Sequence, residues 1–126
     1  MNIAIVGSRG FTEYSLLSST ILSFLKEQNI LDKPTIISGG AKGADTLAEQ
    51  FADENDFPKQ IFKADWDRYG KAAGYIRNVE IIKACDVCFA FWDGQSKGTK
   101  MDIDLCKEAH KPCFVVNYLD SQQSLF

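Results

Sequence analysis

Short apolar runs alternate with helix-like segments along most of this chain. The apolar runs cover residues 2–8, 34–40, 59–65, 86–92 and 112–118. The segments between them repeat apolar residues at spacings of three and four, as one face of a helix does, over residues 13–28, around 44–51, 71–85 and 99–110. Strands that are apolar on both faces and alternate with helices predict an α/β fold. We expect a doubly wound parallel sheet of about five strands with helices on both faces.

The composition is typical of a soluble globular protein, and we expect one domain over residues 1–126, with no clear pattern in the tail 118–126. Hydrophobic residues make up 45% of the chain and charged residues 25%. The first residues lack the charged front of a signal peptide, and no apolar run approaches the roughly 18 residues of a membrane span. We therefore expect a cytoplasmic protein without a membrane partner. The net charge of −3 argues against a nucleic acid partner.

The four cysteines, Cys85, Cys88, Cys106 and Cys113, are expected to remain thiols in the cytoplasm. Cys85 and Cys88 have the spacing of a zinc-binding pair. However, Cys88 lies inside the run "DVCFAFW" and Cys113 begins "PCFVV", where cysteine behaves as a small core residue. We therefore expect no metal and no cofactor.

Glycine, small hydroxyl groups and a cation recur where the predicted strands end. In an open parallel sheet, ligands bind beyond the carboxyl ends of the strands. Glycine allows close approach of a backbone, and a helix N-terminus attracts anions. These turns predict a phosphate-binding edge, whose candidate residues are Gly7, Ser8, Arg9, Ser38, Gly39, Gly40, Lys42, Gly43, Asp65, Trp66, Asp93, Gly94, Ser96, Lys97, Gly98 and Thr99.

The turns match none of the common nucleotide-binding or hydrolase motifs. GxxxxGK[ST] is absent, which excludes a P-loop ATPase, and "GGAKG" differs from the GxGxxG of NAD-dependent dehydrogenases. His110 is the only histidine and ends a helix beside Lys111, where its side chain stabilises the helix C-terminus. No Ser-His-Asp set can therefore be assembled.

Asp102 occupies the first inward position of the last predicted helix, because it shares a stripe with Leu105 and Cys106. Two interpretations stay open. The carboxylate either stabilises the helix N-terminus or points into the ligand cleft. Arg77, near the middle of the third predicted helix, either reaches that cleft or lies in solvent, and periodicity does not decide between them.

Four motifs together resemble the SLOG superfamily over about residues 1–117, and its small stand-alone branch in particular. They are "GSRGFT", "SGGAKGADTLAEQFA", "KADWDRYGKAAGYIRN" and "FWDGQSKGT". The resemblance implies a Rossmann-like fold. It also implies a nucleotide or a nucleotide-derived ligand such as ADP-ribose.

A sister group, the LOG nucleoside 5′-monophosphate phosphoribohydrolases, carries PGGxGTxxE and an upstream RKxxM. Gly98, Thr99 and Asp102 match GTxxE with aspartate in place of glutamate. Arg77 matches the arginine of RKxxM, and Asn78 replaces its lysine. The stand-alone branch usually lacks a carboxylate at the Asp102 position, so this chain departs from it toward the enzymes. The resemblance thus implies Asp102 and Arg77 as catalytic candidates and Asn78 as a ligand-binding one.

These observations predict a protein that senses or sequesters a nucleotide-derived small molecule, of the AMP or ADP-ribose type, at the C-terminal edge of the sheet. The alternative is an N-glycosidic hydrolase of nucleoside 5′-monophosphates, in which Asp102 stabilises positive charge developing on the ribose. A third hypothesis is a protein-interaction module with a vestigial cleft. LOG-like relatives are commonly dimers, and the apolar helices permit a homodimer.

Overall fold

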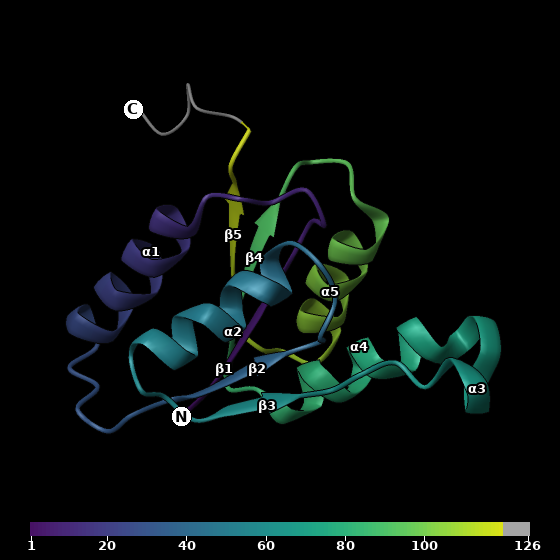
Figure 1. Ribbon diagram of the computed structural model, residues 1–126, viewed down its shortest axis with the longest axis horizontal. Coiled ribbons are helices and arrows are strands. Elements are labelled where there is room, and N and C mark those ends of the chain that lie inside the picture. Colours follow the sequence, from purple (N-terminus) through teal and green to yellow (C-terminus); the bar gives the residue numbers. More distant parts are fainter. Residues whose placement is uncertain (120–126) are drawn as a thin grey trace.

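The computed structural model describes residues 1–119, which form a five-stranded parallel sheet flanked by helices (Figure 1). The strands are β1 (Asn2–Gly7), β2 (Thr35–Ser38), β3 (Lys59–Ile61), β4 (Val87–Trp92) and β5 (Cys113–Asn117). Their order in the sheet is β3-β2-β1-β4-β5, and every neighbouring pair is parallel. The predicted Rossmann-like sheet is therefore confirmed. Part of the predicted tail, residues 120–126, lies outside the described residues.

The strand order reverses at β1, whose neighbours are β2 and β4. The chain moves outward from β1 to β2 and β3, and then returns to place β4 on the other side of β1. At such a switch point the loops that leave neighbouring strands turn in opposite directions and open a crevice at the carboxyl ends. The loops after β1 and β4 therefore border the expected binding site.

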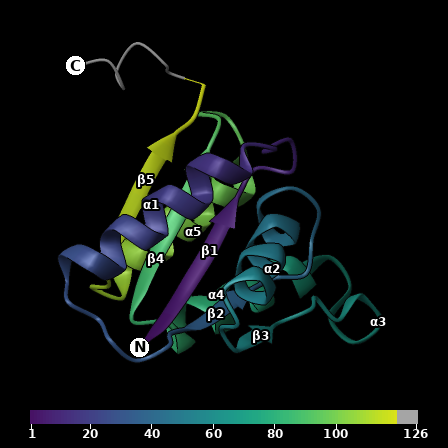
Figure 2. The same ribbon diagram turned by 60° about the vertical axis from the view of Figure 1, so that its left-hand side comes forward.

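Two helices cover each face of the sheet (Figure 2). One face carries α1 (Tyr14–Glu27) and α2 (Ala44–Glu54), and the other carries α4 (Ala73–Ala84) and α5 (Lys97–Glu108). Within residues 1–119, no helix is long and apolar enough to cross a membrane.

The structure contains one helix that the sequence pattern did not predict. This helix, α3 (Trp66–Tyr69), extends away from the sheet in Figure 1, and a 3₁₀ turn (Gly70–Ala72) joins it to α4. Its four residues are too few to show helical periodicity. The carboxylate of Asp65 caps it by accepting a hydrogen bond from the backbone N–H of Arg68, at 3.1 Å.

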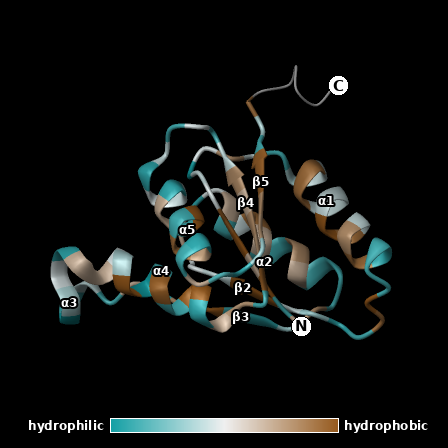
Figure 3. Cartoon of the chain, turned by 180° about the vertical axis from the view of Figure 1, so that it is seen from behind, coloured by the Kyte–Doolittle hydropathy of each residue, from teal (hydrophilic) through white to brown (hydrophobic). Residues whose placement is uncertain are grey.

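The two faces of the sheet bury separate hydrophobic clusters, because successive residues of a strand point to opposite faces. Ile3 and Ile5 of β1 pack against α1 and α2, whereas Ala4 and Val6 pack against α4 and α5. Figure 3 shows that hydrophobic and hydrophilic residues alternate along α1, as expected of a helix that buries one face against the sheet. The apolar character of β1 on both faces therefore follows from its central position.

The outer strands β3 and β5 depart from the expectation that all strands are buried on both faces. Lys59 and Gln60 of β3 are exposed, and Phe114 and Val115 of β5 are 46% and 45% exposed. Each of these strands has one neighbour in the sheet. Edge position, which an apolar run in a sequence does not reveal, explains the difference.

Gly7→Ala tests the close packing at the end of β1. An added Cβ would lie 2.5 Å from the carbonyl oxygen of Phe91 and 2.7 Å from the Cβ of Ala44, so β4 or α2 must shift. We expect a loss of about 1–3 kcal/mol in the free energy of unfolding, measured by urea denaturation. Gly10→Ala is the matched control, because a Cβ there meets no heavy atom within 4 Å. Equal stability of the two variants would contradict this packing.

Candidate functional site

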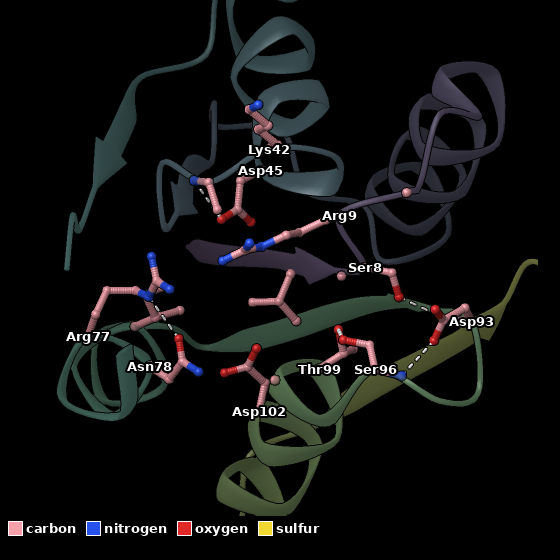
Figure 4. Close-up of a pocket in the computed structure, with 16 residues that line it drawn as sticks. Ser8, Arg9, Lys42, Asp45, Arg77, Asn78, Asp93, Ser96, Thr99 and Asp102 are labelled. Carbon is pink, nitrogen blue, oxygen red and sulfur yellow. Dashed lines mark hydrogen bonds between the residues drawn. The ribbon is translucent and has the colours of Figure 1, made fainter. Parts of the chain in front are cut away.

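A cavity of about 480 Å³ opens at the carboxyl edge of the sheet, between the loops that follow β1, β2 and β4 (Figure 4). It brings together eleven residues that the sequence singled out, from four separate segments of the chain. They are Gly7, Ser8, Arg9, Lys42, Arg77, Asn78, Asp93, Ser96, Gly98, Thr99 and Asp102. Their grouping at one edge agrees with the predicted location, and their roles stay a prediction.

Ser8 ties the loop after β1 to the loop after β4. Its backbone N–H donates to the carbonyl oxygen of Phe91 at 3.0 Å, and its hydroxyl oxygen accepts from the backbone N–H of Asp93 at 3.2 Å. Ser8 is buried, whereas the neighbouring Arg9 is exposed. Figure 4 shows the side chain of Arg9 extending across the cavity, so Ser8 fixes the loop and Arg9 offers the charge.

The loop after β2 packs directly on the loop after β1. Gly43 has a φ of +79°, and an added Cβ would lie 2.4 Å from the carbonyl oxygens of both Ser8 and Arg9. The hydroxyl of Ser38 donates to the carbonyl oxygen of Asp45 at 3.3 Å. Gly43 and Ser38 were predicted to bind ligand, but neither lines the cavity, and these contacts shape the loop.

Asp93 shapes the turn before α5. Its Oδ1 accepts hydrogen bonds from the backbone N–H groups of Ser96, at 2.7 Å, and Gln95, at 2.8 Å. The bond from Ser96, followed by that from Gln95, holds the pKa of Asp93 below its ordinary value. One oxygen of this predicted ligand-binding carboxylate is therefore already engaged in the turn.

Asp102 lies at the bottom of the cavity in Figure 4 and is 5% exposed, as its helical phase predicted. Within the described part of the chain, its Oδ1 has no hydrogen-bond partner. Burial raises the pKa of Asp102 to about 8, with a further contribution from the charge of Asp45, while Arg77 opposes the shift. At neutral pH the group is therefore mostly a neutral carboxylic acid that can donate a hydrogen bond.

Asp45, in the first turn of α2, is a cavity residue that the sequence analysis missed. It is 9% exposed, and its Oδ2 accepts from the backbone N–H of Ala41 at 3.1 Å. Burial raises the pKa of Asp45, and the hydrogen bond from Ala41 and the charge of Arg77 oppose this. The signal that could have found it is the acid directly after the glycine loop "GGAKGAD", which parallels Asp102 after "DGQSKGT".

Arg77 reaches the cavity, which answers the question that periodicity left open. Its Nη1 donates to the carbonyl oxygen of Gly39 at 2.7 Å, and its Nε donates to Oδ1 of Asn78 at 2.9 Å. Its charge lowers the pKa of both Asp45 and Asp102. Arg77 therefore spans from α4 to the loop after β2 and offsets the two buried carboxyl groups.

A second cavity of about 450 Å³ adjoins the first and shares Arg9, Ala41, Lys42 and Arg77 with it. The predicted residues Gly39, Gly40 and Trp66 line this second cavity, together with Lys63, which the sequence analysis missed.

Three further predicted residues lie outside both cavities. Gly94 and Lys97 border a separate groove beside Trp92, and Asp65 caps α3. The sequence could not distinguish these three residues from those that line the cavities, because all of them follow predicted strands.

Comparison with solved structures shows that this fold occurs in DNA processing protein A. The protein from Helicobacter pylori, whose single-stranded DNA binding mode has been described, aligns with a TM-score of 0.68 and 23% identity. The one from Streptococcus pneumoniae aligns with a TM-score of 0.69 and 20% identity. The alignments cover 91% and 90% of this chain, which spans only 64% and 49% of the two larger proteins.

These comparisons overturn the expected sensor of an AMP-like or ADP-ribose-like ligand, together with its alternative, hydrolysis of nucleoside monophosphates. The expectation that nucleic acid is no partner is also wrong, since a protein of this fold binds single-stranded DNA. Net charge averages over the whole surface. Arg9, Lys42 and Lys63 border two adjoining cavities, where a local positive field can act on its own.

Sequence comparison identifies the family. The Gene 61 protein of Mycobacterium phage D29 is 36% identical over 91 residues, which cover 68% of this chain and 71% of the phage protein. The model of the YspA, cpYpsA-related SLOG family matches residues 1–69. Since that match spans more than half of the chain and includes the loops after β1 and β2, this protein belongs to the YspA, cpYpsA-related SLOG family.

Proposed function

We propose that this protein binds single-stranded DNA along the carboxyl edge of its sheet. The observation that carries the proposal is that the two adjoining cavities share Arg9, Lys42 and Arg77. Together they make up the proposed groove, and two adjoining cavities suit several linked nucleotides better than they suit one small molecule. The occurrence of the same fold in a protein that binds single-stranded DNA supports this choice.

The cations along the groove are available to DNA phosphates. The ion pairs among residues 1–119 are Lys33–Asp56, Lys59–Asp53 and Lys100–Asp104, and all of them lie elsewhere. Arg9, Lys42 and Lys63 therefore form no ion pair in the described part of the chain. The carboxyl groups of Asp45, Asp93 and Asp102 do line the first cavity. Phosphate contacts by cations supply most sequence-independent affinity for DNA. Backbone N–H groups of the glycine-containing turn after β1 add donors at the same edge.

An aromatic ring stands beside the second cavity. Trp66 is 57% exposed and lines that cavity, which is unusual for a tryptophan in a packed domain. Bases of a single strand stack on exposed aromatic rings with little sequence preference. In the proposed complex, Trp66 stacks on a base while Lys63 and Arg9 hold the adjoining phosphates.

Asp102 contributes in its neutral form. A protonated carboxyl group donates to a phosphate oxygen or to a base acceptor, and its unpartnered Oδ1 gains a hydrogen bond when the strand occupies the cavity. Ionisation would place a negative charge beside the phosphates. The proposed site therefore depends on the burial that keeps this group protonated.

The affinity for DNA should depend steeply on salt. With about three phosphate contacts, the slope of log K against log salt is about −2, so affinity falls about 20-fold between about 50 and 200 mM salt. Fluorescence anisotropy of a labelled oligothymidylate measures this. Lys42→Ala should weaken binding and reduce the slope by about 0.7. Arg9→Ala should weaken binding more, because it removes a fork of donors at the cavity.

Lys26→Ala is the control with the same change of charge, since Lys26 is exposed in the last turn of α1, at the opposite end of the sheet. It should leave both the affinity and the slope unchanged. The proposal fails if the intact protein gives no anisotropy change at low salt, or if Lys42→Ala and Lys26→Ala bind alike.

The affinity should also fall as pH rises past 8, because Asp102 then ionises next to phosphate. We expect at least about a fivefold loss between pH 7 and 9, which corresponds to ~1 kcal/mol of like-charge repulsion. Asp102→Asn cannot ionise, so its affinity should change less over this range. Anisotropy titrations at each pH measure both proteins. Glu80→Gln, at an exposed position of α4, is the control and should follow the unchanged protein.

The same variants give an independent readout in thermal unfolding. A folded-state pKa of about 8 means that the folded protein keeps a proton that the unfolded chain releases, so stability falls from about pH 4 to pH 8. Asp102→Asn removes this loss. The melting temperature of Asp102→Asn relative to that of the unchanged protein should therefore rise up to about pH 8 and then stay constant. A constant advantage at all pH values would show that Asp102 is not protonated as described.

A further inference from the structure

Three cysteines that are far apart in the sequence meet between β4, β5 and α5. The sulfur atoms of Cys88, Cys106 and Cys113 all lie within 4.8 Å of one another. Cys88 lies opposite Cys113 in the register of β4 and β5, and Cys106 of α5 belongs to the same hydrophobic cluster. The fourth cysteine, Cys85, is buried too but is not part of this group.

The distances between the three sulfur atoms are compatible with one shared ion. A buried cysteine on its own is an ordinary small core residue. Three that converge from three elements can also surround one metal ion. With metal–sulfur bonds of about 2.3 Å, an ion in the centre of a sulfur triangle holds the sulfur atoms about 4 Å apart. The observed spacing therefore requires only small side-chain movements.

The three thiols must lose protons before they can hold a metal ion. The thiolate is the form of cysteine that binds metals. The ammonium of Lys111 lies nearby, held by the carbonyl oxygens of Lys83, at 2.8 Å, and Cys85, at 2.7 Å.

The ligand set indicates which kind of ion would bind. Within residues 1–119, no fourth cysteine, histidine or carboxylate joins the three sulfur atoms. Structural zinc sites almost always have four protein ligands, and catalytic ones keep a position for water. Cys88 and Cys106 have no exposed surface, and the surrounding cluster is apolar, so water is a poor fourth ligand here. Thiolates in a dry, three-coordinate setting favour monovalent copper.

We propose that Cys88, Cys106 and Cys113 form a binding site for one soft, thiophilic metal ion, with Cu(I) as the ion that fits three sulfur ligands. The ion enters beside Cys113, which is the partly exposed member of the three on the edge strand β5. On binding, the three thiols release their protons to solvent, and copper keeps its oxidation state. The site is separate from the groove proposed for DNA, although Cys106 and Asp102 lie one turn apart on α5.

The test is an anaerobic titration of the reduced, metal-free full chain with Cu(I), in competition with a coloured Cu(I) chelator. We expect one equivalent to bind and the melting temperature to rise. Cys113→Ser removes a direct ligand at the most exposed position. Loss of a residue that only hydrogen-bonds to a metal ligand costs roughly 10- to 100-fold in metal affinity. The affinity of Cys113→Ser for Cu(I) should fall by more than this.

Cys85→Ser is the matched control. It removes a buried thiol outside the cluster, and serine can keep the bond that Cys85 donates to the carbonyl oxygen of Ile82. Its copper affinity should equal that of the unchanged chain. A second measurement needs no variant: alkylation of Cys113 by iodoacetamide, followed by mass spectrometry, should be rapid without copper and suppressed with one equivalent.

Three results would overturn the assignment. They are a failure of Cu(I) to compete with the chelator, an undiminished affinity in Cys113→Ser, or unchanged alkylation of Cys113 in the presence of copper. A parallel titration with Zn²⁺ checks the choice of ion. Tight binding of zinc with weak binding of copper would show that the site completes a fourth position and is not a three-sulfur site.

Discussion

The close backbone packing of three loops at the carboxyl ends of β1, β2 and β4 is the constraint on which the site depends. A single carbon added at Gly7 would strike the backbone of β4 at 2.5 Å, and one added at Gly43 would strike the loop after β1 at 2.4 Å. Glycine is needed at these positions for packing, and at Gly43 also for a positive φ. Because the loops lock together, Arg9, Lys42 and the start of α5 are held around one cavity.

The second feature that organises the site is the balance of charge among its buried groups. Asp45 and Asp102 are both buried beside the cavity. Burial raises the pKa of each, the charge of Asp45 adds to the rise at Asp102, and the charge of Arg77 opposes both shifts. In the proposed complex, each ionised carboxylate of the cavity would repel phosphate. Burial of Asp102 reduces this repulsion by keeping that group protonated at neutral pH. The net charge of the chain says nothing about this local balance.

Much of the fold followed from the order and character of the segments. The five strands and four main helices were all anticipated, because runs that are apolar on both faces and alternate with helices suit a parallel sheet. The single turn of α3 was missed since four residues carry no periodicity, and the exposure of Phe114 was missed since edge position depends on strand order. Among the site residues, Asp45 and Lys63 were missed because no regular pattern marks them. Net charge argued against a nucleic acid partner because it averages over the whole surface, and the small-molecule ligand was expected from motifs that resemble the SLOG superfamily.

The sequence by itself determined which residues could stand at the ligand edge and that Asp102 faces inward, because helical phase is a local property. Only the tertiary structure decided that Arg77 reaches the cavity, since this depends on how α4 packs beside the loop after β2. It also decided that two cavities adjoin and share lining residues, and that three distant cysteines meet. Such contacts arise from strand order and helix packing, and spacing along a chain does not encode them.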